Sequence, residues 1–161
     1  MIYRIANIDD LEQIIIMKNN VKRRVIEQGL PIWKNGYPLD SMIEEDIHEQ
    51  AGRVVELEGE IVAYSVFHHR SCEYDSKTFK HDNLMCFGRV MVKTGYTGMH
   101  IGDFLVKSMI EEAKSLNVEG MGITADACNI KAVNLYTKHG FKKEGEKEFP
   151  YAYLDLFGLY F

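Results

Sequence analysis

The hydrophobic pattern along the chain predicts a mixture of strands and helices. Apolar residues recur at alternate positions in some segments, as in strands, and at intervals of three or four in others, as in helices. The segments predicted as strands are 2–6, 53–57, 61–69, 84–93, 120–126 and the aromatic tail 151–161. The segments predicted as helices are 11–28, 40–51, 99–116 and 129–139. This order predicts an α/β fold in which helices cover both faces of a mixed sheet.

Polar stretches and turn residues separate these elements. Asp9 or Asp10 can cap the first long helix. The polar segment 70–83 is predicted as a long loop between two strands. Because no repeat or linker interrupts the pattern, residues 1–161 are predicted to form a single domain.

Composition narrows the classes of protein that fit. Apolar residues make up 46% of the chain, enough for a folded core, and no apolar run reaches the roughly 18 residues that span a bilayer. The N-terminus lacks the features of a signal peptide. The formal net charge of −5 argues against a nucleic-acid partner. Three widely spaced cysteines argue against a disulfide framework or a zinc site, so we expect a cytoplasmic protein without a metal.

A strand that runs into a glycine-containing turn and then a helix spans residues 90–105. Free backbone N–H groups at a helix N-terminus, with glycines that allow close approach, suit a pyrophosphate. The alternative is an ordinary tight turn between a strand and a helix. The segment is not a Walker motif, and the spacing of its glycines does not match a dinucleotide fingerprint.

A second informative stretch, 129–141, follows one strand later. Asn129 and Tyr136 are seven residues apart and share one helix face, with Ala132 between them. This set can form the wall of a ligand groove. The alternative is that Asn129 only caps the helix and that Tyr136 is a half-buried aromatic residue.

Together the two stretches resemble the GNAT superfamily of acetyl-CoA-dependent N-acetyltransferases. In the loop, the positions that match the family pattern are Val92, Tyr96, Gly98, Ile101 and Gly102. The departures are Thr94 for proline, Thr97 for arginine and His100 for glycine. The later pattern matches at every fixed place: Asn129, Ala132, Leu135, Tyr136, Gly140 and Phe141. The stretch GLPIWKNGYP also resembles a segment of some bacterial members.

The resemblance implies a mostly antiparallel GNAT-like sheet and transfer of acetyl from acetyl-CoA to a primary amine in a ternary complex. It places the cofactor-binding residues at Val90, Met91, Val92, Thr97, Gly98, Met99, His100, Ile101, Gly102, Asp103, Asn129, Ala132 and Tyr136. Val90 and Val92 would pair with the pantetheine arm, from a strand that a bulge splays, and a backbone N–H near Met91 would polarise the thioester carbonyl.

The resemblance makes Tyr136 the catalytic residue that protonates the departing thiolate. Trp33, Tyr37 and His68 are the candidate residues for the acceptor, an amine on a small molecule or a peptide. His68, His69 and Glu73 are weighed as bases, with surface exposure as the alternative. The aromatic tail is predicted as a core strand, with a homodimer edge as the alternative. A second hypothesis for the whole chain is an acetyl-CoA-binding sensor without turnover.

Overall fold

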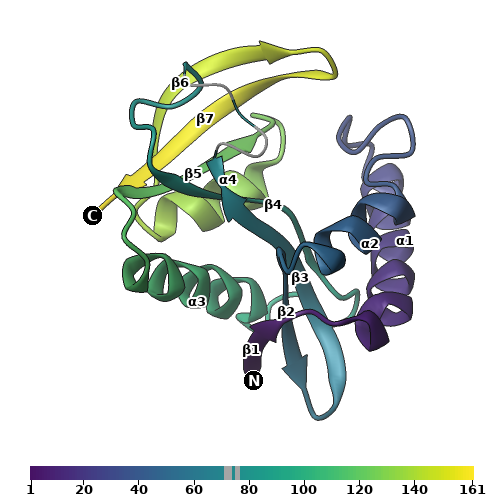
Figure 1. The fold of residues 1–161 in the computed structure, drawn as a ribbon. Coiled ribbons are helices and arrows are strands. Elements are labelled where there is room, and N and C mark those ends of the chain that lie inside the picture. The colour runs from purple at the N-terminus through teal and green to yellow at the C-terminus, as the bar shows by residue number, and fades with distance from the viewer. Residues whose placement is uncertain (71–73, 75–76) are drawn as a thin grey trace. The chain divides into compact units, whose positions relative to one another are not determined.

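The computed structural model describes the whole chain except residues 71–73 and 75–76. The helices are α1 (Leu11–Glu27), α2 (Asp40–His48), α3 (Ile101–Ser115) and α4 (Ile130–Lys138), with a short 3-10 helix, η1 (Ile8–Asp10) (Figure 1). The strands are β1 (Ile2–Ile5), β2 (Gly52–Leu57), β3 (Glu60–His69), β4 (Leu84–Val92), β5 (Gly120–Ala125), β6 (Lys142–Phe149) and β7 (Ala152–Tyr160). No helix among the described residues has the length and apolar character needed to cross a membrane.

The strands form one seven-stranded sheet in the order β1-β2-β3-β4-β5-β7-β6. The pairs β1/β2, β2/β3, β5/β7 and β6/β7 are antiparallel, and β4/β5 is parallel. The prediction of an α/β fold with a mixed, mostly antiparallel sheet is confirmed. The aromatic tail forms β7, which lies between β5 and β6, so it is an interior strand, as predicted, and not a sheet edge.

Two compact units make up the chain. One contains Met1–Val66 and Arg89–Leu105, and the other contains Phe67–Gly88 and Val106–Phe161. Strands β3 and β4 and helix α3 each contribute residues to both units. The first unit contains the loop between β4 and α3, and the second contains α4, so the two sequence stretches that carry the resemblance belong to different units.

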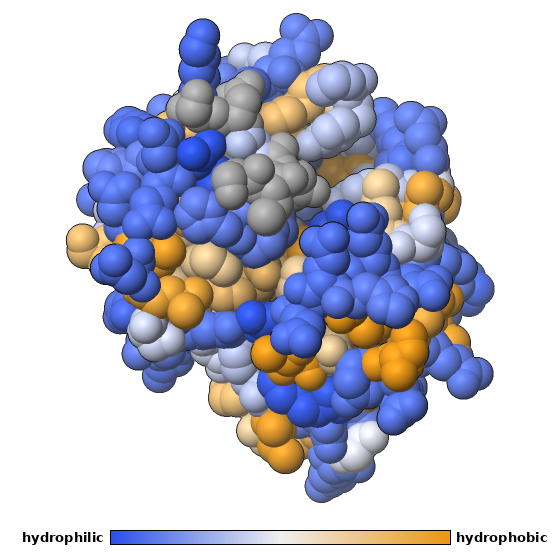
Figure 2. Space-filling view, in the orientation of Figure 1, coloured by the Kyte–Doolittle hydropathy of each residue, from blue (hydrophilic) through white to orange (hydrophobic). Residues whose placement is uncertain are grey.

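In the first unit, α1 buries one stripe of side chains. Ile14, Met17, Val21 and Val25 have exposed fractions of 7% or less and belong to one core cluster. Their spacing of three or four residues is that of a helix with one buried face. The other faces of α1 stay in contact with solvent, and Ile26 is 73% exposed. The surface in Figure 2 is mainly hydrophilic, with hydrophobic residues reaching it in separate patches.

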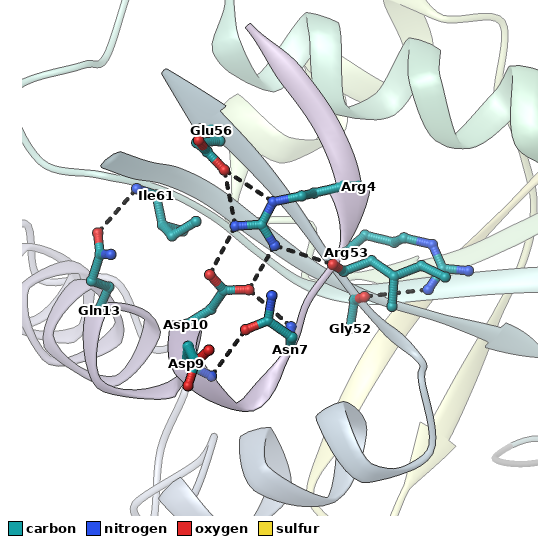
Figure 3. A network of polar contacts seen from close by, with 10 residues as sticks. Arg4, Asn7, Asp9, Asp10, Gln13, Gly52, Arg53, Glu56 and Ile61 are labelled. Atoms are coloured by element: carbon teal, nitrogen blue, oxygen red, sulfur yellow. Dashed lines mark hydrogen bonds and ion pairs between the residues drawn. The ribbon is translucent and has the colours of Figure 1, made fainter. Parts of the chain in front are cut away.

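The start of α1 differs from its prediction. Asp10 makes no side-chain capping bond to α1. Its carboxylate instead accepts two hydrogen bonds from Arg4, at 2.7 and 2.8 Å, and one from the backbone N–H of Asn7 at 2.8 Å (Figure 3). Asn7 is the capping residue, and it caps η1 by accepting from the N–H of Asp9 at 2.9 Å. The bonds from Arg4 hold the pKa of Asp10 below its ordinary value.

The second unit contains a strand that the sequence pattern did not predict. Strand β6 has the sequence KKEGEKEF and no apolar alternation, so it lacks the usual strand signal. It pairs with β7 along its length and lies at the end of the sheet. Lys143 forms ion pairs with Glu146 at 2.7 Å and with Asp155 of β7 at 3.2 Å. The charged segment therefore forms a strand because its backbone pairs with the apolar strand β7.

The segment predicted as a loop, 70–83, is partly packed. Tyr74 and Phe79 meet edge to face with ring centroids 5.3 Å apart. Phe79 belongs to a core cluster with Leu84, Cys86 and Leu156, and the partly buried Tyr74 packs against this cluster. The Tyr74 hydroxyl is 3.3 Å from the hydroxyl of Thr124. Cys72 and Glu73, the latter weighed as a base, lie outside the described residues.

Candidate active site

The loop between β4 and α3 contains three residues in the left-handed region. Gly95, Gly98 and His100 have φ of 93°, 86° and 59°. Glycine adopts such angles without penalty, whereas a residue with a Cβ rarely does. His100 thus keeps a backbone conformation that suits the glycine it replaces. The loop is closed by bonds from Tyr96 N–H to Lys93 O and from Met99 N–H to Tyr96 O, at 3.0 and 3.3 Å.

The same loop presents a group of unsatisfied N–H donors at the start of α3. The first bond into the helix runs from Phe104 N–H to His100 O at 3.0 Å. Within the part of the chain that the structure describes, the N–H groups of Gly98, His100, Ile101 and Gly102 have no acceptor. These donors lie at the positive end of the helix dipole, which favours a bound anion. The arrangement can hold a phosphate or another anionic group.

Glu60, at the start of β3, anchors the loop from the side. Its carboxylate accepts hydrogen bonds from the Lys93 ammonium and, at 2.5 Å, from the Tyr96 hydroxyl. These donated bonds lower the pKa of Glu60. A further bond joins Lys93 N–H to Val62 O at 2.8 Å. Sequence reasoning missed Glu60, because its partners Lys93 and Tyr96 lie 33 and 36 residues further along the chain.

Two of the three departures in the loop, Thr97 and His100, face solvent. Thr97 is exposed, and its hydroxyl accepts a hydrogen bond from Arg24 of α1 at 3.1 Å. The side chain of His100 is 80% exposed, and its Nδ1 is 3.2 Å from a carboxylate oxygen of Asp103. His100 is therefore partnered by an acidic group, which offsets the charge that a protonated imidazole would bring to the loop.

Strand β4 carries a backbone irregularity next to the predicted cofactor residues. Arg89 has φ of 49° within the strand, as in some β-bulges, and it lies in the segment 88–92 where a bulge was expected. The parallel ladder from β4 to β5 ends at Cys86 and Gly122, while β5 continues to Ala125. Beyond Arg89, Met91 is buried in the core, whereas Val90 and Val92 are only half-buried.

A buried polar cluster fixes the side chain of Arg89. One guanidinium nitrogen lies 3.8 Å from a carboxylate oxygen of Asp46, and that oxygen accepts a bond of 2.6 Å from the Tyr64 hydroxyl. Burial is the main cause that raises the pKa of Tyr64. The Arg89 guanidinium also lies 5.8 Å from the ring centroid of Tyr37, which is a cation–π distance. Sequence reasoning named Tyr37 but missed Arg89 and Asp46.

The candidate acceptor residues have different surroundings. Trp33 is half-buried and has φ of 54°. It packs against the core cluster that contains α1, so it helps to hold the loop between α1 and α2 in place. Tyr37 contacts Arg89, as described above. His68 belongs to the second unit, and its Nδ1 is 2.9 Å from the carbonyl oxygen of His69. His69 Nε2 is 3.1 Å from the side-chain oxygen of Asn83.

In the second unit, α4 places the residues of the later motif. Asn129 is the capping residue, and its side-chain oxygen accepts from the N–H of Ala132 at 3.4 Å. Tyr136 is 4% exposed and packs edge to face against Phe87 and Phe141, with centroids 5.4 and 6.3 Å apart. Burial raises the pKa of its phenol. The hydroxyl makes no hydrogen bond to any described residue.

Comparisons with known proteins show the family and the fold of the chain. The family model described as the acetyltransferase (GNAT) family matches residues 24–141. The fold and this match define an acyltransferase. The chain belongs to the GNAT family of acetyltransferases, which use acetyl-CoA. No curated protein sequence matches the chain.

Solved structures share the fold at low sequence identity. A GNAT acetyltransferase from Streptococcus agalactiae has a TM-score of 0.83 at 18% identity, covering 99% of this chain and 94% of that one. A ribosomal-protein-alanine N-acetyltransferase from Brucella melitensis has a TM-score of 0.76 at 21% identity, covering all of both chains. An aminoglycoside acetyltransferase solved with coenzyme A has a TM-score of 0.77 at 17% identity, covering 98% and 93%.

Proposed function

We propose that this enzyme transfers acetyl from acetyl-CoA to a primary amine by direct attack within a ternary complex, and that residues 1–161 act as one catalytic domain. The observation that carries the proposal is the group of unsatisfied N–H donors at Gly98, His100, Ile101 and Gly102. Such donors bind an anion without a charged side chain. Family membership supports the diphosphate of acetyl-CoA as this anion.

The other cofactor contacts follow from the two motifs. Thr97, Met99 and Asp103 belong to the loop that presents the N–H donors. In β4, the half-buried Val90 and Val92 offer backbone groups to the pantetheine arm, and the N–H near Met91 polarises the thioester carbonyl. In α4, Asn129 and Ala132 supply the groove wall, and Tyr136 donates a proton to the departing thiolate of coenzyme A.

The acceptor amine must lose its proton before it attacks. A lysine-like amine has a pKa of about 10.4, so only about one molecule in two thousand is neutral at pH 7. Trp33 and Tyr37 in the first unit, and His68 in the second, are each proposed as a contact of the acceptor. Two of the structural neighbours described above act, by their names, on a protein alanine and on an aminoglycoside, and both classes of acceptor carry amines.

A panel of amines with acetyl-CoA, analysed by mass spectrometry, tests the proposed function. The panel contains aminoglycosides, polyamines, amino acids and peptides with different N-termini. We expect at least one acceptor to gain the mass of an acetyl group less that of the hydrogen it replaces, in step with release of free thiol. Saturable binding of acetyl-CoA without any acetylated product would favour a sensor instead.

Replacing Asn129 with alanine separates capping from cofactor binding. The cap bond is long, 3.4 Å, so its loss should cost about 0.5 kcal/mol, the low end for such caps. If Asn129 also contacts the cofactor, acetyl-CoA affinity falls as well. Asn129→Ser is the matched control, because serine restores the cap without the amide. We expect calorimetry to show reduced affinity in both variants, with a lower melting temperature only in Asn129→Ala; unchanged affinity in both would leave Asn129 as a cap alone.

A further inference from the structure

The N-terminal helix reaches the cofactor loop through one arginine. Arg24, in the last turns of α1, donates a hydrogen bond of 3.1 Å to the Thr97 hydroxyl, 73 residues away in sequence. Thr97 itself carries no charge, although it stands next to Gly98, whose N–H is one of the unsatisfied donors. The guanidinium of Arg24 therefore contacts the loop directly, through the side chain of Thr97.

One face of α1 lines a hollow beside this loop. The hollow measures about 480 Å³ and is lined by Asn20, Arg23, Arg24, Glu27 and Thr94. The four helical residues are spaced by three or four positions, so they share one face of α1. A different face of the helix is buried in the core, which fixes the position of the arginines.

The two arginines in this hollow have unused binding capacity. Within the described residues, neither Arg23 nor Arg24 lies within 4.0 Å of an acidic oxygen, and Arg24 gives one bond to a neutral hydroxyl. A guanidinium has five N–H donors in a planar fork, which matches the oxygen atoms of a phosphate. Glu27 is the one acidic residue of the hollow, so the charge balance of the lining favours an anion.

We propose that Arg24, assisted by Arg23, binds a phosphate group of acetyl-CoA and supplies from α1 the positive charge that the loop lacks at Thr97. The proposal rests on the proposed use of acetyl-CoA. The cofactor has two sources of phosphate, the diphosphate and the 3′-phosphate of the ribose. The N–H donors of the loop take the first, and Arg24 lies where it can take either an oxygen of the same group or the second phosphate.

Calorimetry with acetyl-CoA and with its 3′-dephospho form tests this role. We expect Arg24→Gln to weaken acetyl-CoA binding about tenfold, which is about 1.4 kcal/mol, with a shallower dependence of affinity on salt. A loss confined to acetyl-CoA identifies the 3′-phosphate as the ligand of Arg24. An equal loss with both forms identifies the diphosphate. Lys114→Gln is the matched control, because it removes one exposed positive charge from the last turn of α3, and it should bind like the parent protein.

A double variant that moves the positive charge from α1 to the loop provides a second test. Adding Thr97→Arg to Arg24→Gln returns the cation to the loop, and we expect this double variant to regain most of the lost affinity. Melting curves confirm that each variant is folded. Unchanged affinity of a folded Arg24→Gln for both cofactor forms, or a loss that Thr97→Arg does not repair, would overturn the assignment of Arg24 while leaving the proposed function intact. Absence of acetyl-CoA binding by the parent protein would overturn both.

Discussion

Replacement of Tyr136 by phenylalanine should lower kcat about 100-fold, the usual contribution of a general acid, while acetyl-CoA affinity stays the same. The substitution removes only the hydroxyl, and the ring keeps its contacts with Phe87 and Phe141. The hydroxyl forms no hydrogen bond with the described residues, so its loss strands no internal partner. Proton donation to the thiolate belongs to the reaction step, so the effect should appear in kcat rather than in binding.

The pH dependence gives a second readout for Tyr136. Burial raises the pKa of its phenol above the ordinary value of 10, so the group stays protonated throughout the neutral and mildly alkaline range. Ionisation of Tyr136 should therefore produce no fall in kcat below about pH 10, the ordinary pKa of a phenol. Tyr151→Phe is the matched control, because Tyr151 is 68% exposed, and it should keep full activity. Full thiol release by Tyr136→Phe with a good acceptor would leave Tyr136 as part of the groove wall.

Introducing glutamate at Gly102 should weaken acetyl-CoA binding at least tenfold, about 1.4 kcal/mol. Gly102 lies in the first turn of α3, where its N–H is one of the proposed diphosphate donors. The carboxylate would compete for the same positive end of the helix and repel the cofactor. A negative charge at a helix N-terminus also stabilises the helix, so the melting temperature should not fall for electrostatic reasons.

This opposition between stability and affinity distinguishes Gly102→Glu from general damage. Gly102→Gln has nearly the same size without the charge, so the difference between the two variants measures the electrostatic part. We expect calorimetry to show a larger loss of affinity for the glutamate variant, and the difference should shrink as salt is added. Equal affinity of a folded Gly102→Glu and the parent protein would exclude this turn as the phosphate site.

The long elements could be predicted from local pattern, because each buries one periodic face. The prediction placed the first helix at 11–28, and α1 spans Leu11–Glu27. Strand β6 could not be predicted in this way, since its charged side chains show no apolar period and only its pairing with β7 defines it. The cap at Asp10 was wrong for a related reason: Arg4, on strand β1, competes for the carboxylate.

In the candidate site, too, local features could be predicted and long-range contacts could not. The glycine turn and the motif from Asn129 to Phe141 are contiguous in sequence, so both could be found without a structure. Contacts that join distant segments could not be found. Arg24 meets Thr97 across 73 residues, and Glu60 meets Tyr96 across 36. Nothing in the sequence near Thr97 or Tyr96 states which distant side chain completes the loop.

The two ends of the sheet have different consequences for self-assembly. Strand β6 ends the sheet with lysines and glutamates, which oppose the addition of a strand from another molecule. Strand β1 ends it on the other side with four residues, of which Ile2 and Ile5 are 57% and 47% exposed. If two copies of the chain meet through their sheets, β1 is the edge open to pairing. Each molecule then has one edge that can pair, β1, and one edge that opposes pairing, β6. Once two copies have paired through β1, neither has a second edge for another copy, so this pairing gives a dimer and not a filament.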